Sequence, residues 1–411
     1  MSKTKKSGKK DLVPQLRFPE FREAGEWERN ILGGLFENRQ EAGFDSLPLL
    51  SLTDKDGIIP QEESNRKSNA SADKSRYLRV LPGDIAYNTM RMWEGRSAYA
   101  DREGIISPAY TVCKPTGTAN GLFYSYYFKT RQLIEQFRRY SQGLVKDTLN
   151  LKYPAFAQIP VLLPRPEEQQ KIADCLSSID ALIAGQAEKV DALKTHKKGL
   201  MQQLFPREGE TVPRLRFPEF RKAGKWPTIL AGKIFSNRVE RGEPGLPIYS
   251  VTMTEGLVPR DSLDRRIDDI ADVRANKTVR KGDLAYNMMR MWQGALGVAP
   301  EDCMVSPAYI VVKPCGVNPL FFYFQLKLPG TLQTLTAHSR GLTEDRLRLY
   351  YEDFAKVPLL NPSLLEQNRI ADFLASIDAL ISRQEERLDA LKFHKKGLMQ
   401  RLFPSPEAMD V

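Results

Sequence analysis

The feature that most constrains the fold is an internal repeat that covers almost the whole chain of 411 residues. Three sequence motifs recur in the same order, each displaced by 199 residues. They are LRFPEFREAGEW at Leu16 and LRFPEFRKAGKW at Leu215, GDIAYNTMRMWEG at Gly83 and GDLAYNMMRMWQG at Gly282, and ISPAYTVCKP at Ile106 and VSPAYIVVKP at Val305. A period near 200 residues is far too long for a solenoid, so the repeat indicates duplication of a whole domain.

The longest match closes each copy. Residues Glu168–Pro206 and Glu366–Pro404 are identical at 28 of 39 positions. Their offset is 198, so one residue was gained or lost after the SPAY motif. The chain therefore reads as module, helix, module, helix.

Apolar residues in both closing segments follow the 4-3-4-3 spacing of a coiled-coil seam. The expected helix-pairing residues are Ile172, Leu176, Ile179, Ile183, Val190 and Leu193 in the first copy, and Ile370, Leu374, Ile377, Ile381, Leu388 and Leu391 in the second. Polar residues interrupt the seam at matching places, Gln186 and Lys197 in one copy and Gln384 and Lys395 in the other.

Two interpretations of these segments stay open, an ordinary amphipathic surface helix and a coiled coil. The matched interruptions and the length of more than four heptads favour the coiled coil. Two similar helices with a globular module between them close most simply as an antiparallel pair. Each would span about 50 Å at 1.5 Å per residue and hold the modules apart.

The helices are expected to stop at Pro206 and Pro404. The segment VPxLRFPEF follows the first helix at Val212 and also occurs near the N-terminus, at Val13. The end of the second helix could thus be joined to the N-terminus without breaking the pattern, which indicates circular pseudo-symmetry.

Each module is expected to be a small α/β domain with a β-rich core. Short runs rich in Val, Ile and Tyr, bounded by Gly, Pro and Asp, predict strands, and LFYSYYFKTRQLIEQFRRYS with its partner predicts helices that lead into a loop beginning Gly-Leu. We call this the GL loop; it starts at Gly143 in the first module and at Gly341 in the second.

Ten side chains of the turns and GL loops are candidates for DNA contact, because Arg and Asn read base edges, Lys and Arg contact phosphates and an aromatic ring can pack on a sugar or base. They are Asn88, Arg91, Trp93, Lys146 and Lys152 in the first module, and Asn287, Arg290, Trp292, Arg346 and Arg348 in the second. The alternative for the YNxMRMWxG turn is structural, with the methionines and tryptophan pinning it to the core.

The parts that differ between the copies are polar and loop-like. They include the GL loops and the segments from Gln61 and from Pro259. A kept scaffold with changed loops is what two readers of different DNA words would show, although drift on solvent loops gives the same pattern.

Lys and Arg exceed Asp and Glu by 61 to 51, which gives a net charge of +10 and suits a polyanionic partner as well as simple solubility. The four cysteines have no metal-ligand spacing, and no apolar run is long enough to cross a membrane. The sequence also lacks a P-loop, a GxGxxG after a strand and HExxH, so we expect no catalytic, metal or cofactor site.

The combination GDxAYNxMRMWxG, SPAYxVxKP, a GL loop, a Pro-ended strand and EQxxIAxxLxSIDALI resembles the target-recognition module of Type I restriction–modification specificity subunits. It occurs twice, in the right order. The likeness of the two modules departs from the many relatives in which they clearly differ.

The resemblance implies an α/β (α+β) protein: two pseudo-symmetric target-recognition domains with mixed β-rich cores, separated by two long helices that pair as an antiparallel coiled coil. The expected segments are a basic arm (1–14), the first recognition domain (15–164), the central helix (165–206), a linker with the second domain (207–362), the C-terminal helix (363–404) and a tail (405–411).

It also implies a non-catalytic cytoplasmic subunit that binds double-stranded DNA, two methyltransferase subunits and restriction/translocase subunits. The partners would use S-adenosylmethionine, ATP and Mg, and this chain no cofactor. Two other classes stay open: a coiled-coil adaptor that binds only protein, which the positive charge disfavours, and a single-chain DNA-modifying enzyme, which would need motifs that the sequence lacks.

Overall fold

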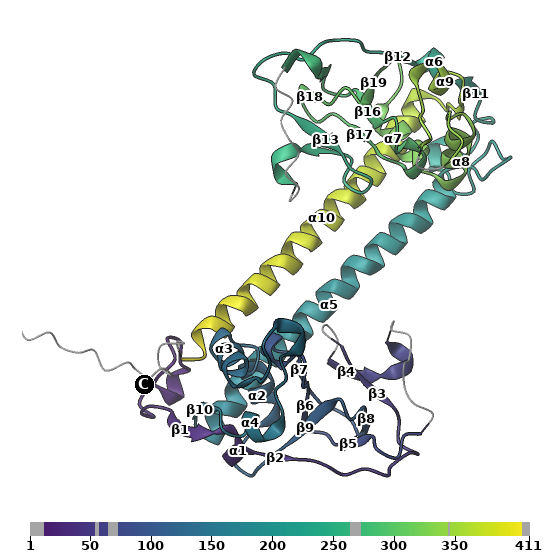
Figure 1. Cartoon of the computed structure of the whole chain (residues 1–411). Helices are drawn as coiled ribbons and strands as arrows, with labels where there is room; N and C mark the ends of the chain where they lie inside the picture. Colours follow the sequence, from purple (N-terminus) through teal and green to yellow (C-terminus); the bar gives the residue numbers. More distant parts are fainter. Residues whose placement is uncertain (1–11, 54–56, 65–72, 264–272, 344–345, 405–411) are drawn as a thin grey trace, which may run out of the picture. The chain divides into compact units, whose positions relative to one another are not determined.

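The computed structural model describes residues 12–53, 57–64, 73–263, 273–343 and 346–404. The chain forms two compact units, Met1–Ala187 with Glu386–Val411, and Glu188–Glu385. Each unit contains one module and a part of each long helix (Figure 1).

The first module is built around several short antiparallel sheets. Its four-stranded sheet has the order β2 (Phe36–Asn38), β9 (Tyr110–Pro115), β6 (Ile85–Asn88) and β7 (Ser97–Tyr99). Three strand pairs accompany it: β1 (Glu28–Ile31) with β10 (Pro160–Leu163), β3 (Leu50–Thr53) with β4 (Gly57–Pro60), and β5 (Leu78–Val80) with β8 (Gly104–Ile106). The helices are α1 (Leu32–Leu35), α2 (Gly121–Tyr127), α3 (Arg131–Tyr140) and α4 (Tyr153–Phe156), with the 3-10 turns η1 (Pro19–Phe21), η2 (Gln61–Glu63), η3 (Met92–Glu94) and η4 (Lys146–Thr148).

The four-stranded sheet separates two cores, because successive side chains of a strand point to opposite faces. On β6, Ile85 and Tyr87 pack into an aromatic core with α2 and α3. Ala86, between them, packs into a smaller core with β3, β4 and β5.

The second module repeats the strands and short α-helices of the first in the same order. Its four-stranded sheet has the order β12 (Phe235–Asn237), β19 (Tyr309–Pro314), β16 (Leu284–Asn287) and β17 (Leu296–Val298). The strand pairs are β11 (Thr228–Leu230) with β20 (Pro358–Leu360), β13 (Tyr249–Val251) with β14 (Leu257–Pro259), and β15 (Lys277–Val279) with β18 (Cys303–Val305). The helices are α6 (Ala231–Ile234), α7 (Pro319–Leu326), α8 (Pro329–Ala337) and α9 (Tyr351–Phe354), with the 3-10 turns η5 (Pro218–Phe220), η6 (Arg260–Ser262), η7 (Val273–Ala275) and η8 (Met291–Gln293). The expected α/β fold class and duplication are confirmed.

A buried ion pair ties each module to the start of its long helix. In the first unit, Arg17 of the RFPEF motif contacts Glu168 through two hydrogen bonds of 2.7 Å. In the second, Arg216 contacts Glu366 in the same two-pronged way at 2.7 and 2.8 Å. All four side chains are less than a tenth exposed. We call each pair a clasp; it explains why the RFPEF and EQ motifs both recur.

The glutamine of the EQ motif completes the attachment. The side chain of Gln169 donates to the carbonyls of Thr118 and Pro164 and accepts from the backbone N–H of Asn120. Gln367 likewise accepts from the backbone N–H of Asn318 in the second unit. These buried amides satisfy backbone groups of the loop before α2 or α7, so the motif is structural.

The long helices are α5 (Pro166–Leu204) and α10 (Leu364–Arg401). Each of the twelve expected pairing residues is buried or half-buried, as are the two seam glutamines. Within each unit the start of one helix and the end of the other enter the same core, as with Leu176 and Leu402 in the first unit. The helix parts therefore run antiparallel in both units, as predicted.

Each of the two seam lysines forms an ion pair with an aspartate of the other helix. In the first unit Lys395 donates to both carboxylate oxygens of Asp180, at 2.6 and 2.8 Å, and lies 5.1 Å from the centre of the Tyr126 ring. In the second unit Lys197 binds Asp378 in the same way and lies 5.0 Å from the centre of the Phe324 ring. These pairs set the alignment of the helices within each unit.

The two seams differ in the group beside the aspartate. In the first unit the Tyr126 hydroxyl donates to Asp180 at 2.8 Å, and burial together with this bond raises the pKa of Tyr126. Phe324 has no hydroxyl for the matching contact. In the second unit, burial, helped by the charge of Lys197, lowers the pKa of Lys327 to about 8. The Lys327 ammonium donates to the Tyr323 hydroxyl at 2.9 Å.

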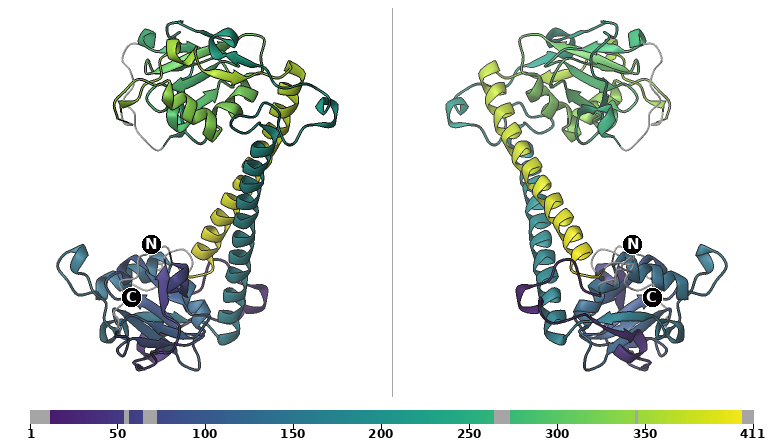
Figure 2. Two further views of the ribbon diagram at one scale, coloured as in Figure 1. Left: turned by 90° about the vertical axis from the view of Figure 1, so that its right-hand side faces the viewer. Right: turned by 90° about the vertical axis from the view of Figure 1, so that its left-hand side faces the viewer.

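The expected circular pseudo-symmetry is confirmed in the packing. The backbone N–H of Leu215 donates to Gln203 at the end of α5, and in the first unit that of Leu16 donates to Arg401 at the end of α10. Phe403 stacks on Tyr127 with ring centres 4.9 Å apart. Figure 2 shows this end of α10, in yellow, against the purple and blue first module. The last helix thus closes the first module.

Candidate nucleic-acid interface

The turn after β6 is held by its own polar side chains. The Asn88 side chain accepts from the backbone N–H of Met90, and the Trp93 indole N–H donates to the Met90 carbonyl at 3.0 Å. Met92 is fully buried and Gly95 adopts a φ of 78°, which favours glycine. The Arg91 side chain remains half exposed, with a contact of 3.4 Å to Glu94.

The turn after β16 has the same geometry. Asn287 accepts from the backbone N–H of Met289, and the Trp292 indole donates to the Met289 carbonyl at 3.1 Å. Arg290 is exposed and contacts Gln293 at 3.5 Å, where the first module has a glutamate. The guanidinium of Arg290 therefore contacts a neutral amide, whereas that of Arg91 contacts a carboxylate that also pairs with Arg96.

Each GL loop is closed by a pair of backbone hydrogen bonds. Gln142 and Asn150 exchange both of theirs, at 2.9 and 2.8 Å, and so do Arg340 and Arg348. In the first loop Lys146 and Lys152 are exposed, and in the second Arg346 is exposed. The Arg348 side chain is half-buried and donates to the carbonyl of Arg346 at 3.3 Å.

The fold joins the turn and the GL loop in both modules. Just beyond the first loop, the backbone N–H of Leu151 donates to the carbonyl of Thr89 at 2.8 Å. The matching bond, from Leu349 to Met288, measures 2.9 Å. Both leucines are fully buried, so the loops are anchored next to the turns. Segments that are some 60 residues apart in the sequence thus form one surface, which we call the turn–loop surface.

The ten predicted contact residues fall into two groups on this surface. Exposed cations that a phosphate or base could reach are Arg91, Lys146, Lys152, Arg290 and Arg346. Part-buried side chains with a bond to their own turn or loop are Asn88, Trp93, Asn287, Trp292 and Arg348. A role of all ten in DNA binding stays a prediction, and the exposed cations are the better candidates.

Sequence reasoning missed Arg340, which lies at the base of the second GL loop. It forms an ion pair of 2.6 Å with Asp353 and lies 5.6 Å from the centre of the Tyr350 ring. Its guanidinium lowers the pKa of Asp353. The matching residue of the first module is Gln142. The sequence feature that could have identified Arg340 is thus a positive charge that is present in only one copy of the repeat.

Parts of the variable loops lie outside the described residues. These are 65–72 in the first module, 264–272 in the second and 344–345 in the second GL loop. Across the residues that are described, His, Cys, Asp and Glu form no group of three that could hold a metal ion. Every helix over the same ranges is too short or too polar to cross a bilayer.

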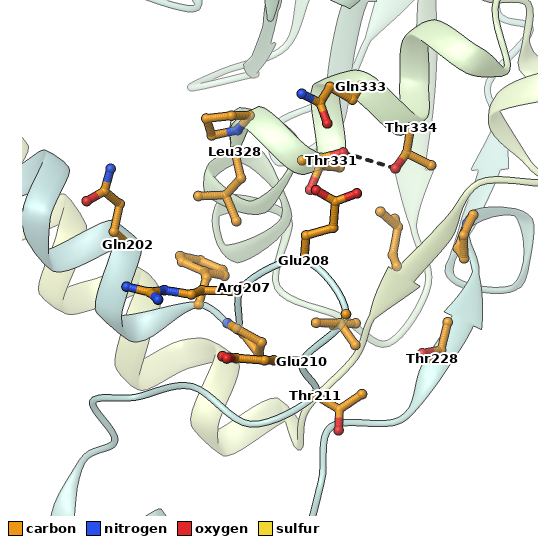
Figure 3. A pocket seen from close by; sticks show the side chains of 18 of the residues that line it. Gln202, Arg207, Glu208, Glu210, Thr211, Thr228, Leu328, Thr331, Gln333 and Thr334 are labelled. Atoms are coloured by element: carbon orange, nitrogen blue, oxygen red, sulfur yellow. Dashed lines mark hydrogen bonds between the residues drawn. The ribbon is translucent and has the colours of Figure 1, made fainter.

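A cavity of about 690 Å³ lies elsewhere in the second unit. Figure 3 shows the end of α5 with Gln202, the linker residues Arg207 and Glu208, and the start of α8 with Thr331 around it. None of the ten predicted contact residues lines this cavity. It is thus separate from the turn–loop surface of its module.

Comparison with known proteins points to one family. Residues 27–195 match the family described as Type I restriction modification DNA specificity domain. The Type I restriction enzyme MjaVIII specificity subunit of Methanocaldococcus jannaschii is 23% identical over 353 residues, which cover 80% of this chain and 81% of the relative.

Two solved structures share the fold. The S subunit of a Type I restriction-modification system from M. genitalium has a TM-score of 0.56 at 14% identity, with 96% of this chain and all of that chain covered. A chain from a study of complex assembly and conformational transition of the type I R-M system has a TM-score of 0.51 at 18% identity, with 92% of this chain and 98% of that chain covered.

Proposed function

We propose that this chain is a Type I restriction–modification specificity subunit, as its similarity to that family suggests, and that each of its modules reads one half of a bipartite sequence in double-stranded DNA. The observation that carries the proposal is the turn–loop surface: in both modules it carries an exposed arginine at the equivalent turn position, Arg91 or Arg290, and at least one exposed cation in the adjoining GL loop. Arginine is the commonest reader of guanine, and lysine neutralises phosphates. Arg91 and Arg290 are the first candidates for base contact.

The two long helices set the gap between the half-sites in this proposal. Their lysine–aspartate pairs fix the alignment of α5 against α10 within each unit. The length of a rigid helix pair increases by about 1.5 Å for each residue in the helices. The spacing of the target is thus a property of helix length rather than of the modules.

The helices also offer docking surface for partner subunits. In the first unit Leu182 and Phe393 are large apolar side chains that are 59% and 78% exposed. We assign such helix faces to two methyltransferase subunits, with restriction/translocase subunits joining the complex. In this proposal the partners carry out catalysis in the cytoplasm and use S-adenosylmethionine, ATP and Mg. This chain determines the DNA sequence at which they act.

The decisive experiment is methylome sequencing of a host that carries this chain together with a Type I methyltransferase subunit. The expected result is adenine methylation at one bipartite motif, and the control is the methyltransferase without this chain. The purified chain by itself should neither methylate nor cut DNA. Methyl transfer by the isolated chain, or a motif that does not depend on it, would contradict the proposal.

A second experiment tests the spacing. Insertion of one heptad at equivalent points of α5 and α10 lengthens the pair by about 10 Å, or about three base-pair steps of 3.4 Å. The half-sites should stay the same and the gap should grow. An active variant with an unchanged gap would show that the helices do not determine spacing.

A further inference from the structure

Each GL loop carries a leucine whose side chain is almost fully in solvent. Leu144 and Leu342 have relative exposures of 102% and 98%, the largest among the exposed hydrophobic residues of the described chain. They occupy matching positions of the repeat, while the next residue changes from Val145 to Thr343. A single exposed leucine is common on protein surfaces, but the same one at the tip of two otherwise changed loops is not explained by drift.

The backbone presents these leucines in a fixed way. Gly143 and Gly341, directly before them, have φ values of 139° and 151°. A Cβ atom on Gly143 would lie 2.5 Å from the carbonyl oxygen of Thr148, and one on Gly341 would lie 2.6 Å from that of Arg346. Only glycine therefore fits where the two sides of the loop approach each other closely. The leucine that follows points into solvent.

Hydrogen bonds stiffen the described parts of both loops in the same way. The backbone N–H of Thr148 donates to Val145 at 2.9 Å, and that of Arg346 donates to Thr343 at 2.9 Å. Because the bonds match although the residues differ, the described parts of the two loops share one conformation. A rigid exposed apolar tip costs little entropy when it enters a partner.

The chemistry around the tips fits DNA better than protein. Lys146 and Arg346, both exposed, lie in the same loops, and the adjoining turns carry Arg91 and Arg290. Such cations suit the phosphates that flank a base stack. The exposed apolar surface that the two GL loops share is the side chain of one leucine. Its area is far smaller than the roughly 800 Å² that each partner buries in a stable protein interface.

We propose that Leu144 and Leu342 act as wedges that enter the base stack, one in each half-site, and unstack a base-pair step. Apolar side chains that enter in this way kink the duplex, and the energy of unstacking depends on the step. Each leucine would thereby contribute to specificity without a hydrogen bond to a base. This inference rests on the proposed function, because it needs modules that bind DNA.

The test uses the full chain with its methyltransferase subunit and a duplex that carries the motif found by methylome sequencing. The fluorescent base 2-aminopurine, which brightens when it is unstacked, is placed in turn at each position of both half-sites. With the unaltered chain we expect a bright step in each half-site, in addition to any signal from the adenine that the methyltransferase turns out of the helix. Leu144→Ala should abolish the first step and Leu342→Ala the second, each lowering affinity for the motif about 10- to 100-fold.

Two matched variants control for side effects. Val145→Thr takes the residue that the second loop already has and should leave both steps bright. Leu144→Met keeps a bulky apolar tip and should retain the first step. Because both leucines are fully exposed, thermal unfolding of the alanine variants should be unchanged.

The outcomes separate the inference from the proposed function. A specific complex in which Leu144→Ala leaves every 2-aminopurine signal and the affinity unchanged would overturn the wedge. So would a variant that loses binding to the methyltransferase rather than to DNA, which would make the leucine a protein contact. An unaltered complex without any sequence preference would instead overturn the proposed function.

Discussion

Each of the two units is held together internally by nearly the same buried contacts, and the units differ in their exposed charges. The clasp of the first unit, Arg17 with Glu168, is reproduced by Arg216 with Glu366. On the turn–loop surface, by contrast, Glu94 is replaced by Gln293. The attachment of a module to the helices is therefore kept between the two units, whereas the exposed charges of the turn–loop surface change.

The strongest test of this comparison is to remove the difference. Replacing residues 28–160 with a copy of residues 227–358 keeps both clasps and both helices. If each module reads one half-site and the antiparallel helices present them in opposed directions, the new target should be an inverted repeat of the second half-site. The measurement is the methylation motif of the chimera.

The unaltered chain, expressed beside the same methyltransferase, is the control for this chimera. A direct repeat would refute the opposed arrangement. Retention of the original first half-site would place specificity in the helices or in the partner subunits.

The next largest effect is expected from breaking one clasp. Glu366→Ala leaves the guanidinium of Arg216 buried without its carboxylate, and loss of one member of such a pair costs about 3–5 kcal/mol. Glu168→Ala should cost the first unit a similar amount, because both pairs are equally buried. Hydrogen exchange followed by mass spectrometry would show which unit loses protection.

A matched control is Glu385→Ala, which removes an ion pair of 2.7 Å with Lys194 that is about half exposed. It should change the free energy of unfolding by less than about 1 kcal/mol. Equal losses for Glu385→Ala and Glu366→Ala would show that burial of the clasp carries no stability.

A pH dependence should separate the second unit from the first. The pKa of Lys327 is lowered to about 8 in the folded second unit, mainly by burial. An unfolded lysine binds its proton up to a pH near 10.4. Between these values the unfolded chain binds more protons, so the second unit gains stability as pH rises, by at most about 1.4 kcal/mol per pH unit.

The variant Lys327→Met should remove this slope between pH 8 and pH 10. Denaturant unfolding at several pH values, followed by a probe in the second unit, measures it. The neighbouring Tyr323 does not titrate in the folded second unit between these pH values, because its pKa is raised to about 12. If the variant kept the slope of the unaltered chain, the pH dependence would belong to a group other than Lys327.

The smallest expected effect concerns the helix seam. Tyr126→Phe gives the first unit the ring that the second unit has, and it removes one hydrogen bond to Asp180. We expect a loss of about 1 kcal/mol, seen as a lower midpoint in thermal unfolding. The reverse change, Phe324→Tyr, offers the same hydroxyl to Asp378 and is the matched control. No change in either variant would show that the aspartate–lysine pair does not need this hydroxyl.

The sequence predicted the duplication, the helices, the strands and the antiparallel seam because each leaves a periodic or repeated pattern. It did not predict the clasps, although both motifs recur, since an ion pair over 151 positions has no local signature. The turn posed the opposite difficulty: Asn88 and Trp93 have side chains typical of DNA contact, yet they bind Met90. Such competition between a local hydrogen bond and an outside partner is visible only in three dimensions.

The closure of the first module by the end of α10 has a consequence for the order of folding. Glu188–Glu385 is continuous in the chain, so the second unit has all its parts before synthesis ends. The first module must wait for Leu402 and Phe403, which follow the whole second unit in the chain, to cover the rings of Trp27 and Tyr127. Its aromatic surface stays exposed on the nascent chain until then, so we expect a chaperone to bind the first module during synthesis.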